Sequence, residues 1–143
     1  MTPRHLVVAI NPRASFGKNE AAGGQVAELL REAGHEVVAL QEESYLALET
    51  SVRRALTADS VLVVVGGDGM VHLGVALARE KSVPLGVIPA GTGNDFARHL
   101  GIPLRPIAGG VDHFLSALTR DPVAIDLGVA RNSSGEAYPF ACV

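Results

Sequence analysis

The sequence predicts an α/β domain with a mostly parallel sheet and helices on both of its faces. Short apolar runs alternate along the chain with segments whose apolar residues recur at helical spacing. The apolar runs lack polar alternation, which is typical of strands that are buried on both sides. The connections are short, so successive parallel strands are expected to be joined through helices by right-handed crossovers.

The beginning of the chain has the pattern of a strand, a helix and a second strand. Residues 6–10 form a continuous apolar run that the turn residues 11–12 end. Residues 19–33 carry apolar side chains at helical spacing, and Gly34 follows where a glycine commonly ends a helix. Residues 37–40 are apolar throughout and predict a short strand.

The same alternation continues around a glycine-rich segment. A helical stripe over residues 44–56 precedes residues 60–65, the most strand-like run in the chain. This run leads directly into Gly-Gly-Asp-Gly at residues 66–69. Residues 70–81 then predict a helix that is apolar on more than one side, and residues 83–88 predict a further strand.

The last third of the chain begins with a second glycine-rich turn. A short helix is predicted over residues 94–100, with Gly101 at its end, and apolar spacing predicts another helix over residues 111–118. A polar turn at residues 132–135 is expected to join two closing strands. These strands are predicted over residues 123–129 and 138–143.

Size and composition exclude several classes of protein. The 143 residues have the size of one domain, and 48% apolar with 19% charged residues excludes a disordered chain. A net charge of -3 without runs of Lys or Arg argues against nucleic acid as a partner. The single Cys142 cannot form an internal disulfide, and residues 6–10 are too short for a signal-peptide core or a membrane span. We therefore expect a cytoplasmic protein.

Three loops are expected to form the functional site, because parallel sheets bind ligands at the carboxyl ends of their strands. These loops follow Asn11, Val65 and Ile88. Eight of the 16 glycines lie between Gly66 and Gly101, mostly in turns that lead into helices. Such turns present backbone N–H groups and a partial positive charge, which favours a phosphate ligand. A tight turn without a ligand is the alternative interpretation.

Asp68 places a negative charge between these glycines, where a phosphate ligand is expected. A divalent cation or a proton-donating hydroxyl group is needed between two such anions, which favours Mg²⁺ coordination or general-base catalysis by Asp68. A carboxylate that caps the following helix is the alternative. Thr92 lies in the second glycine turn, where its hydroxyl group can donate to a phosphate oxygen.

The common nucleotide-binding fingerprints are absent. His72 and Phe96 occupy the positions where G-x-G-x-x-G requires its third glycine, which argues against an NAD-linked Rossmann domain. Lys18 follows Gly17 but precedes Asn19, so a Walker A loop is also absent. A phosphate ligand would therefore bind to a different kind of loop.

Four motifs in order carry a resemblance to a known family. They are NPRASFGK at residues 11–18, GGDG at 66–69, PAGTGNDFAR at 89–98 with LGIP after it, and IDLG at 125–128. Together they resemble the diacylglycerol kinase catalytic domain, a family that includes sphingosine, ceramide and bacterial lipid kinases. GGDG alone is shared with NAD kinases and phosphofructokinases, to which the fold is similar. The resemblance covers nearly the whole chain.

The resemblance implies a domain that binds ATP and Mg²⁺ and transfers the γ-phosphate to a lipid hydroxyl such as that of diacylglycerol. It implies Asp68 as the catalytic residue and Asp68 with Asp126 as metal ligands. The residues that it implies for the nucleotide are Asn11, Ser15, Gly17, Gly66, Gly67, Gly69, Gly91, Thr92, Gly93 and Asn94.

Two departures from the family pattern affect these expectations. Met70 stands where the family has a threonine after GGDG, which removes a hydroxyl group near the expected phosphates. Family members also continue into a second, β-rich domain that carries lipid-binding residues. We expect residues 1–130 to form the ATP-binding catalytic domain and residues 131–143 to begin a strand toward that second domain.

The expected acceptor is accordingly a lipid at a membrane surface, reached through the second domain by a protein that is peripheral to the membrane. We expect little or no activity from this chain alone, and an exposed apolar surface makes a homo-oligomer plausible. An NAD kinase-like enzyme and a nucleotide-binding module without catalysis are the alternative functions.

Overall fold

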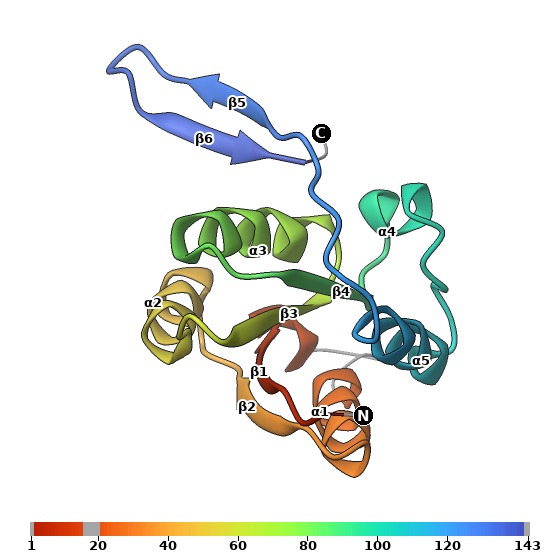
Figure 1. The fold of residues 1–143 in the computed structure, drawn as a ribbon. Coiled ribbons are helices and arrows are strands. Elements are labelled where there is room, and N and C mark those ends of the chain that lie inside the picture. The colour runs from red at the N-terminus through yellow and green to blue at the C-terminus, as the bar shows by residue number, and fades with distance from the viewer. Residues whose placement is uncertain (1, 16–20, 142–143) are drawn as a thin grey trace.

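The computed structural model describes residues 2–15 and 21–141, which form a four-stranded parallel sheet and a two-stranded antiparallel hairpin (Figure 1). The strands are β1 (His5–Ile10), β2 (Glu36–Leu40), β3 (Ser60–Gly66), β4 (Leu85–Pro89), β5 (Gly128–Arg131) and β6 (Ala137–Phe140). The helices are the 3-10 helix η1 (Pro12–Ser15), α1 (Ala22–Glu32), α2 (Tyr45–Ala55), α3 (Asp68–Lys81), α4 (Asp95–His99) and α5 (Ile107–Ala117).

The parallel sheet has the strand order β2-β1-β3-β4, so β1 and β3 are central. Every residue of β3 is buried, as its continuous apolar run predicts for a strand covered on both faces. The register pairs Ile10 with Val65 and Gly66 with Pro89. The carboxyl ends of β1, β3 and β4 therefore lie side by side at one edge of the sheet.

Helices cover both faces of this sheet and create two apolar cores (Figure 1). Leu62 and Val64 of β3 belong to the core beneath α2 and α3, whereas Val63 and Val65 belong to the core beneath α1 and α5. This alternation follows from the period-2 geometry of a strand. Burial of each such side chain contributes about 1.5–3 kcal/mol. The predicted fold class is therefore confirmed.

The prediction of a strand over residues 123–129 is wrong over most of its length. The strand β5 begins only at Gly128, and Val123 is 86% exposed. The stretch before Gly128 pairs with no strand among the described residues, so its apolar side chains have β-propensity but no partner that would satisfy a ladder of hydrogen bonds. The hairpin of β5 and β6 packs beside α3 (Figure 1).

No helix in the described part of the chain has both the length and the apolar content that crossing a bilayer requires.

The contact between α5 and β4 depends on a glycine. A Cβ atom at Gly86 would lie 2.3 Å from Cε2 and 2.7 Å from Cδ2 of Phe114, whose side chain is buried. The Phe114 ring therefore packs directly on the backbone of β4. This close approach holds α5 against the strand that leads into the second glycine-rich turn.

We expect Gly86→Ala to lower the free energy of unfolding by about 1–3 kcal/mol, because the ring and the strand would have to separate. Urea unfolding of the purified protein measures this change. Gly24→Ala is the matched control, since a Cβ atom at Gly24 on α1 meets nothing within 4 Å. The control is expected to raise stability by about 0.5–1 kcal/mol through its helix propensity. Equal effects of the two substitutions would contradict this account.

Candidate functional site

Four chain segments meet at the carboxyl edge of the parallel sheet: the end of β1, the start of α2, the turn between β3 and α3, and the loop between β4 and α4. The backbone N–H of Asn11 donates to the carbonyl of Val65 at 3.2 Å. The N–H of Ala90 donates to the carbonyl of Gly66 at 2.9 Å. These bonds extend the sheet beyond its strands and bring together the three loops that the sequence predicts.

The two glycine-rich turns contact each other through their backbones. A Cβ atom at Gly91 would lie 2.4 Å from Cα and 2.8 Å from N of Gly67. A Cβ atom at Gly93 would lie 3.0 Å from a carboxylate oxygen of Asp68. Side chains at these positions would separate the turns, so glycine is needed for their close approach.

Helix α3 begins at the first glycine turn, two residues earlier than the sequence predicts. Gly67 is its N-cap residue and has no side chain to accept the N–H groups of the first turn. The α3 helix dipole adds a partial positive charge at the same place. This end of α3 can therefore accept an anionic ligand, and the neighbouring glycines keep side chains away from it.

Asp68 links the two glycine-rich turns through its carboxylate. One carboxylate oxygen accepts the N–H of Asp95 at 3.1 Å, and the other accepts the N–H of Phe96 at 3.1 Å. These N–H groups belong to the first turn of α4, so Asp68 caps α4 and not the helix in which it lies. Each oxygen retains a second lone pair, which leaves the carboxylate able to bind a cation.

The pKa of Asp68 lies below its ordinary value. Partial burial raises it, but the backbone N–H groups of Phe96 and Asp95 stabilise the charged form and outweigh the effect of burial. Asp68 is therefore ionised at neutral pH. A carboxylate of such low basicity suits cation binding and electrostatic stabilisation better than general-base catalysis.

Asn94 stabilises the second glycine-rich turn by hydrogen bonds to its backbone. It has a left-handed backbone conformation with φ of 58° and is 8% exposed. Its side-chain oxygen accepts the N–H of Gly91 at 3.0 Å, and its amide nitrogen donates to the carbonyl of Gly91 at 2.8 Å. The resemblance assigns Asn94 to the nucleotide, whereas its amide oxygen and nitrogen both bond Gly91. Its contribution to ligand binding would therefore pass through the shape of the turn.

The exposed side chain of Arg98 also stabilises the loop that contains the second glycine-rich turn. Its guanidinium group pairs with the carboxylate of Asp95 and donates to the carbonyl of Gly93 at 3.0 Å. Thr92 is exposed at the tip of the loop, where its hydroxyl group can reach a ligand. The loop is thus held in one conformation by Asn94, Arg98 and Asp68, while Thr92 extends from it.

Asn11 contacts a residue that the sequence analysis missed. The side-chain oxygen of Asn11 accepts the N–H of Arg13 at 2.9 Å and the hydroxyl group of Tyr45 at 3.2 Å. Tyr45 is the first residue of α2. A signal for it existed, because the loop after β2 ends at the same edge of the sheet as the three predicted loops.

Met70, which stands where the family has a threonine, points its side chain into the core. Its side chain is 1% exposed and belongs to the core beneath α2 and α3. A Cβ atom at Gly66 would lie 2.5 Å from Cγ of Met70. The side chain of Met70 therefore packs against the first glycine turn from the side of the core.

The remaining predicted site residues are Ser15, Gly17 and Asp126. Ser15 ends η1 after β1, and Gly17 lies outside the described residues. Asp126 is exposed in the stretch before β5 and forms no hydrogen bond or ion pair with the described residues. Within residues 2–15 and 21–141, no three His, Cys, Asp or Glu side chains group into a metal site. The pairing of Asp68 with Asp126 stays a prediction.

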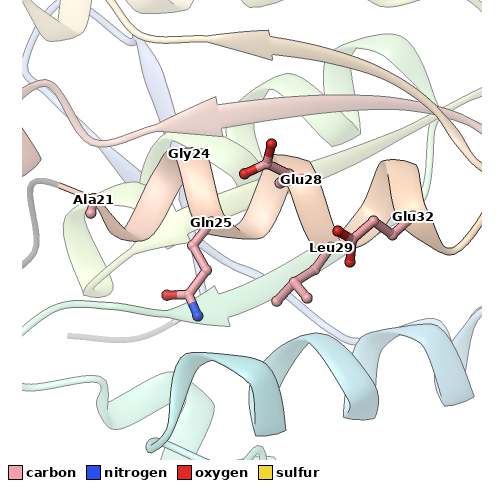
Figure 2. A pocket seen from close by; sticks show the side chains of 6 residues that line it. All are labelled: Ala21, Gly24, Gln25, Glu28, Leu29 and Glu32. Carbon is pink, nitrogen blue, oxygen red and sulfur yellow. The ribbon is translucent and has the colours of Figure 1, made fainter.

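The described part of the chain has hollows on its surface, and one of them adjoins a glycine turn. One, of about 290 Å³, borders the second glycine loop between residues 89–91 and residues 104–107. Another, of about 440 Å³, lies on the exposed side of α1 (Figure 2). Its lining includes the carboxylates of Glu28 and Glu32 and no cation, so it does not suit a phosphate ligand.

The sequence profile of the diacylglycerol kinase catalytic domain matches residues 5–130. The chain belongs to this family. The match begins with β1 and ends within β5, so it includes all four segments that meet at the candidate site. The resemblance seen in the four motifs is thereby confirmed.

Two members of the family are similar to this chain over part of their own length. The diacylglycerol kinase of Mycobacterium tuberculosis is 30% identical over 126 residues, which are 87% of this chain and 40% of that protein. A probable lipid kinase YegS-like protein of Pseudomonas aeruginosa is 44% identical over 80 residues, 54% of this chain and 25% of that protein. This chain therefore spans less than half the length of these relatives.

Solved structures have the same fold. The crystal structure of a diacylglycerol kinase from Bacillus anthracis superposes on this chain with a TM-score of 0.62 and 25% sequence identity. The superposed region covers 79% of this chain and 42% of that protein. The likeness agrees with the predicted diacylglycerol kinase and NAD kinase-like class of parallel sheet with helices on both faces.

The capping bonds of Asp68 make a testable contribution to stability. Because folding lowers the pKa of Asp68, this contribution is present above the ordinary pKa of 3.8 and is lost as the pH falls through the lower, folded-state value. We expect Asp68→Asn to reduce the free energy of unfolding by about 1 kcal/mol at neutral pH and by less near about pH 3. Urea unfolding over this pH range measures the difference.

Asp121→Asn is the control for this experiment, since Asp121 is exposed in the segment after α5. Its effect on the free energy of unfolding should be small, because the side chain is exposed. A loss of stability in Asp68→Asn that is the same at all pH values would contradict an ionised capping carboxylate.

Proposed function

We propose that this chain is the ATP-binding domain of a lipid kinase that transfers the γ-phosphate of ATP to a lipid hydroxyl group such as that of diacylglycerol. The observation that carries this proposal is the backbone contact of Gly67 with Gly91 beside the ionised Asp68. Family membership supports a kinase, and the geometry of the two turns supports a phosphate-bearing ligand.

The residues present fit ATP. The open N-terminus of α3 and the glycine turns can place backbone N–H groups around phosphate oxygens, with no side chain between them and the ligand. Asn11 and Tyr45 border the first turn from the other side. Thr92 can donate its hydroxyl group from the second turn. These groups bind and orient the phosphates, which is most of what phosphoryl transfer requires from a protein.

The residues present also fit Mg²⁺. Asp68 offers one ionised carboxylate, and Mg²⁺ at phosphate sites is commonly held by one or two carboxylates together with phosphate oxygens and water. Asp126 is the proposed second carboxylate. When bound, Mg²⁺ neutralises charge on the phosphates during transfer. Asp68 also keeps the second glycine turn in place through Asp95 and Phe96, so its role in catalysis includes positioning.

We further propose that the lipid acceptor binds largely through residues beyond this domain. The chain aligns with 40% of the mycobacterial relative, and the remaining part of that protein has no counterpart in the alignment. A cytoplasmic protein that reaches its acceptor at the membrane surface is the arrangement we propose. Exposed apolar residues such as Val123 and Tyr138 are available for contact with another domain or a second copy.

Calorimetric titration of Mg²⁺-ATP into this chain tests the nucleotide site. We expect saturable binding, and we expect Gly91→Ala to weaken it at least tenfold, because the added Cβ atom would collide with the backbone of Gly67. Gly24→Ala on α1 is the control and should bind as the unchanged chain does. Absence of binding at millimolar Mg²⁺-ATP would contradict the proposed function of this domain.

A second prediction concerns turnover. With diacylglycerol in mixed micelles and labelled ATP, this chain alone is expected to produce little or no phosphatidic acid, because we propose that the lipid acceptor binds largely through residues beyond this domain. A longer protein that contains this domain should produce it, and Asp68→Asn in that protein should abolish production. Robust turnover by the 143-residue chain would overturn the proposal that the lipid acceptor binds largely through residues beyond this domain.

A further inference from the structure

Tyr45 is held at the edge of the candidate site by the start of α2. The side-chain oxygen of Ser44 accepts the N–H of Ala47 at 3.2 Å, so Ser44 caps α2 and determines that Tyr45 is its first residue. Tyr45 is 38% exposed, and its hydroxyl group donates to Asn11. The tyrosine is therefore partly enclosed and partly accessible from solvent.

The Tyr45 hydroxyl group bridges two of the site's segments. It donates to the side-chain oxygen of Asn11 at 3.2 Å, at the end of β1. It also lies 3.7 Å from the position that a Cβ atom at Gly69 would occupy, in the first turn of α3. A tyrosine that bonds beside the glycine turn can contact whatever the turn binds.

The two donors to Asn11 determine how its amide group is oriented. The backbone N–H of Arg13 can only donate, so the atom of Asn11 that faces it must be the carbonyl oxygen. The hydroxyl group of Tyr45 donates to the same oxygen and occupies its second lone pair. The amide nitrogen of Asn11 has no hydrogen-bond partner among the described residues. Its two N–H groups are therefore available to an external acceptor.

We propose that Tyr45 is a positioning residue of the nucleotide site: its hydroxyl group holds the Asn11 amide so that the amide nitrogen donates to an acceptor atom of the bound nucleotide. This inference rests on the proposed function. The role of Tyr45 is indirect, through Asn11, and its ring lies close enough to the first glycine turn to report on ligand binding.

The tyrosine content of the chain permits a direct spectroscopic test. The sequence contains two tyrosines, Tyr45 and Tyr138, and no tryptophan. Tyr138 lies on β6, where its hydroxyl group bonds Glu136, so Tyr138→Phe leaves Tyr45 as the single source of tyrosine fluorescence. We expect Mg²⁺-ATP to change the emission of the Tyr138→Phe variant. The Tyr45→Phe variant, which reports only from Tyr138, should not respond.

Calorimetric titration separates positioning from general effects on the fold. Loss of one neutral hydrogen bond predicts that Tyr45→Phe weakens Mg²⁺-ATP binding roughly three- to tenfold. Tyr138→Phe is the matched control and should bind as the unchanged chain does. In an Asn11→Ala background, Tyr45→Phe should cause no further loss, because the tyrosine acts through Asn11. Unfolding curves of all variants confirm that each is folded at the assay temperature.

The outcomes distinguish this inference from the proposed function. Binding by the unchanged chain that Tyr45→Phe leaves unaltered would overturn the role of Tyr45 and leave the ATP-binding function intact. Equal losses from Tyr45→Phe with and without Asn11 would also overturn it, since the effect would not pass through Asn11. Absence of Mg²⁺-ATP binding by the unchanged chain would overturn both.

Discussion

The contact between Gly67 and Gly91 is the constraint on which the candidate site depends. The parallel register of β3 and β4 brings the two turns to the same level, and the bond from Ala90 to Gly66 continues that register past the ends of the strands. Only residues without a Cβ atom allow the two backbones to approach this closely. The other side chains of the site are arranged around this contact.

The hydrogen bonds to Asp68 affect both the conformation of the site and the ionisation of the Asp68 carboxylate. The same N–H groups of α4 that position the second loop also lower the pKa of the Asp68 carboxylate and keep it ionised. The side chain that caps α4 is thus also the ionised carboxylate that we propose as a ligand of Mg²⁺. The sequence leaves open a carboxylate that caps the following helix, α3, whereas Asp68 caps α4.

Much of the fold could be predicted because its cause is local. The apolar run of residues 60–65 has no polar position, and only a strand covered on both faces accounts for it. Prediction failed at residues 123–127, where apolar residues suggest a strand but none of the strands in the described part of the chain pairs with them. A pattern also does not reveal whether a residue beside a turn faces the core or the ligand, and the structure shows that Met70 faces the core.

The sequence by itself determined the alternation of strands and helices, the three loops at the site and the family, because apolar periodicity and motif order are properties of the linear chain. Only the tertiary structure decided the partners: Asp68 with the start of α4, Asn94 with Gly91, and Tyr45 with Asn11. Asp68 and Tyr45 find partners at least 27 residues away in sequence, and the Asn94 bond requires a left-handed backbone. Such contacts depend on strand register and helix placement, which no local pattern encodes.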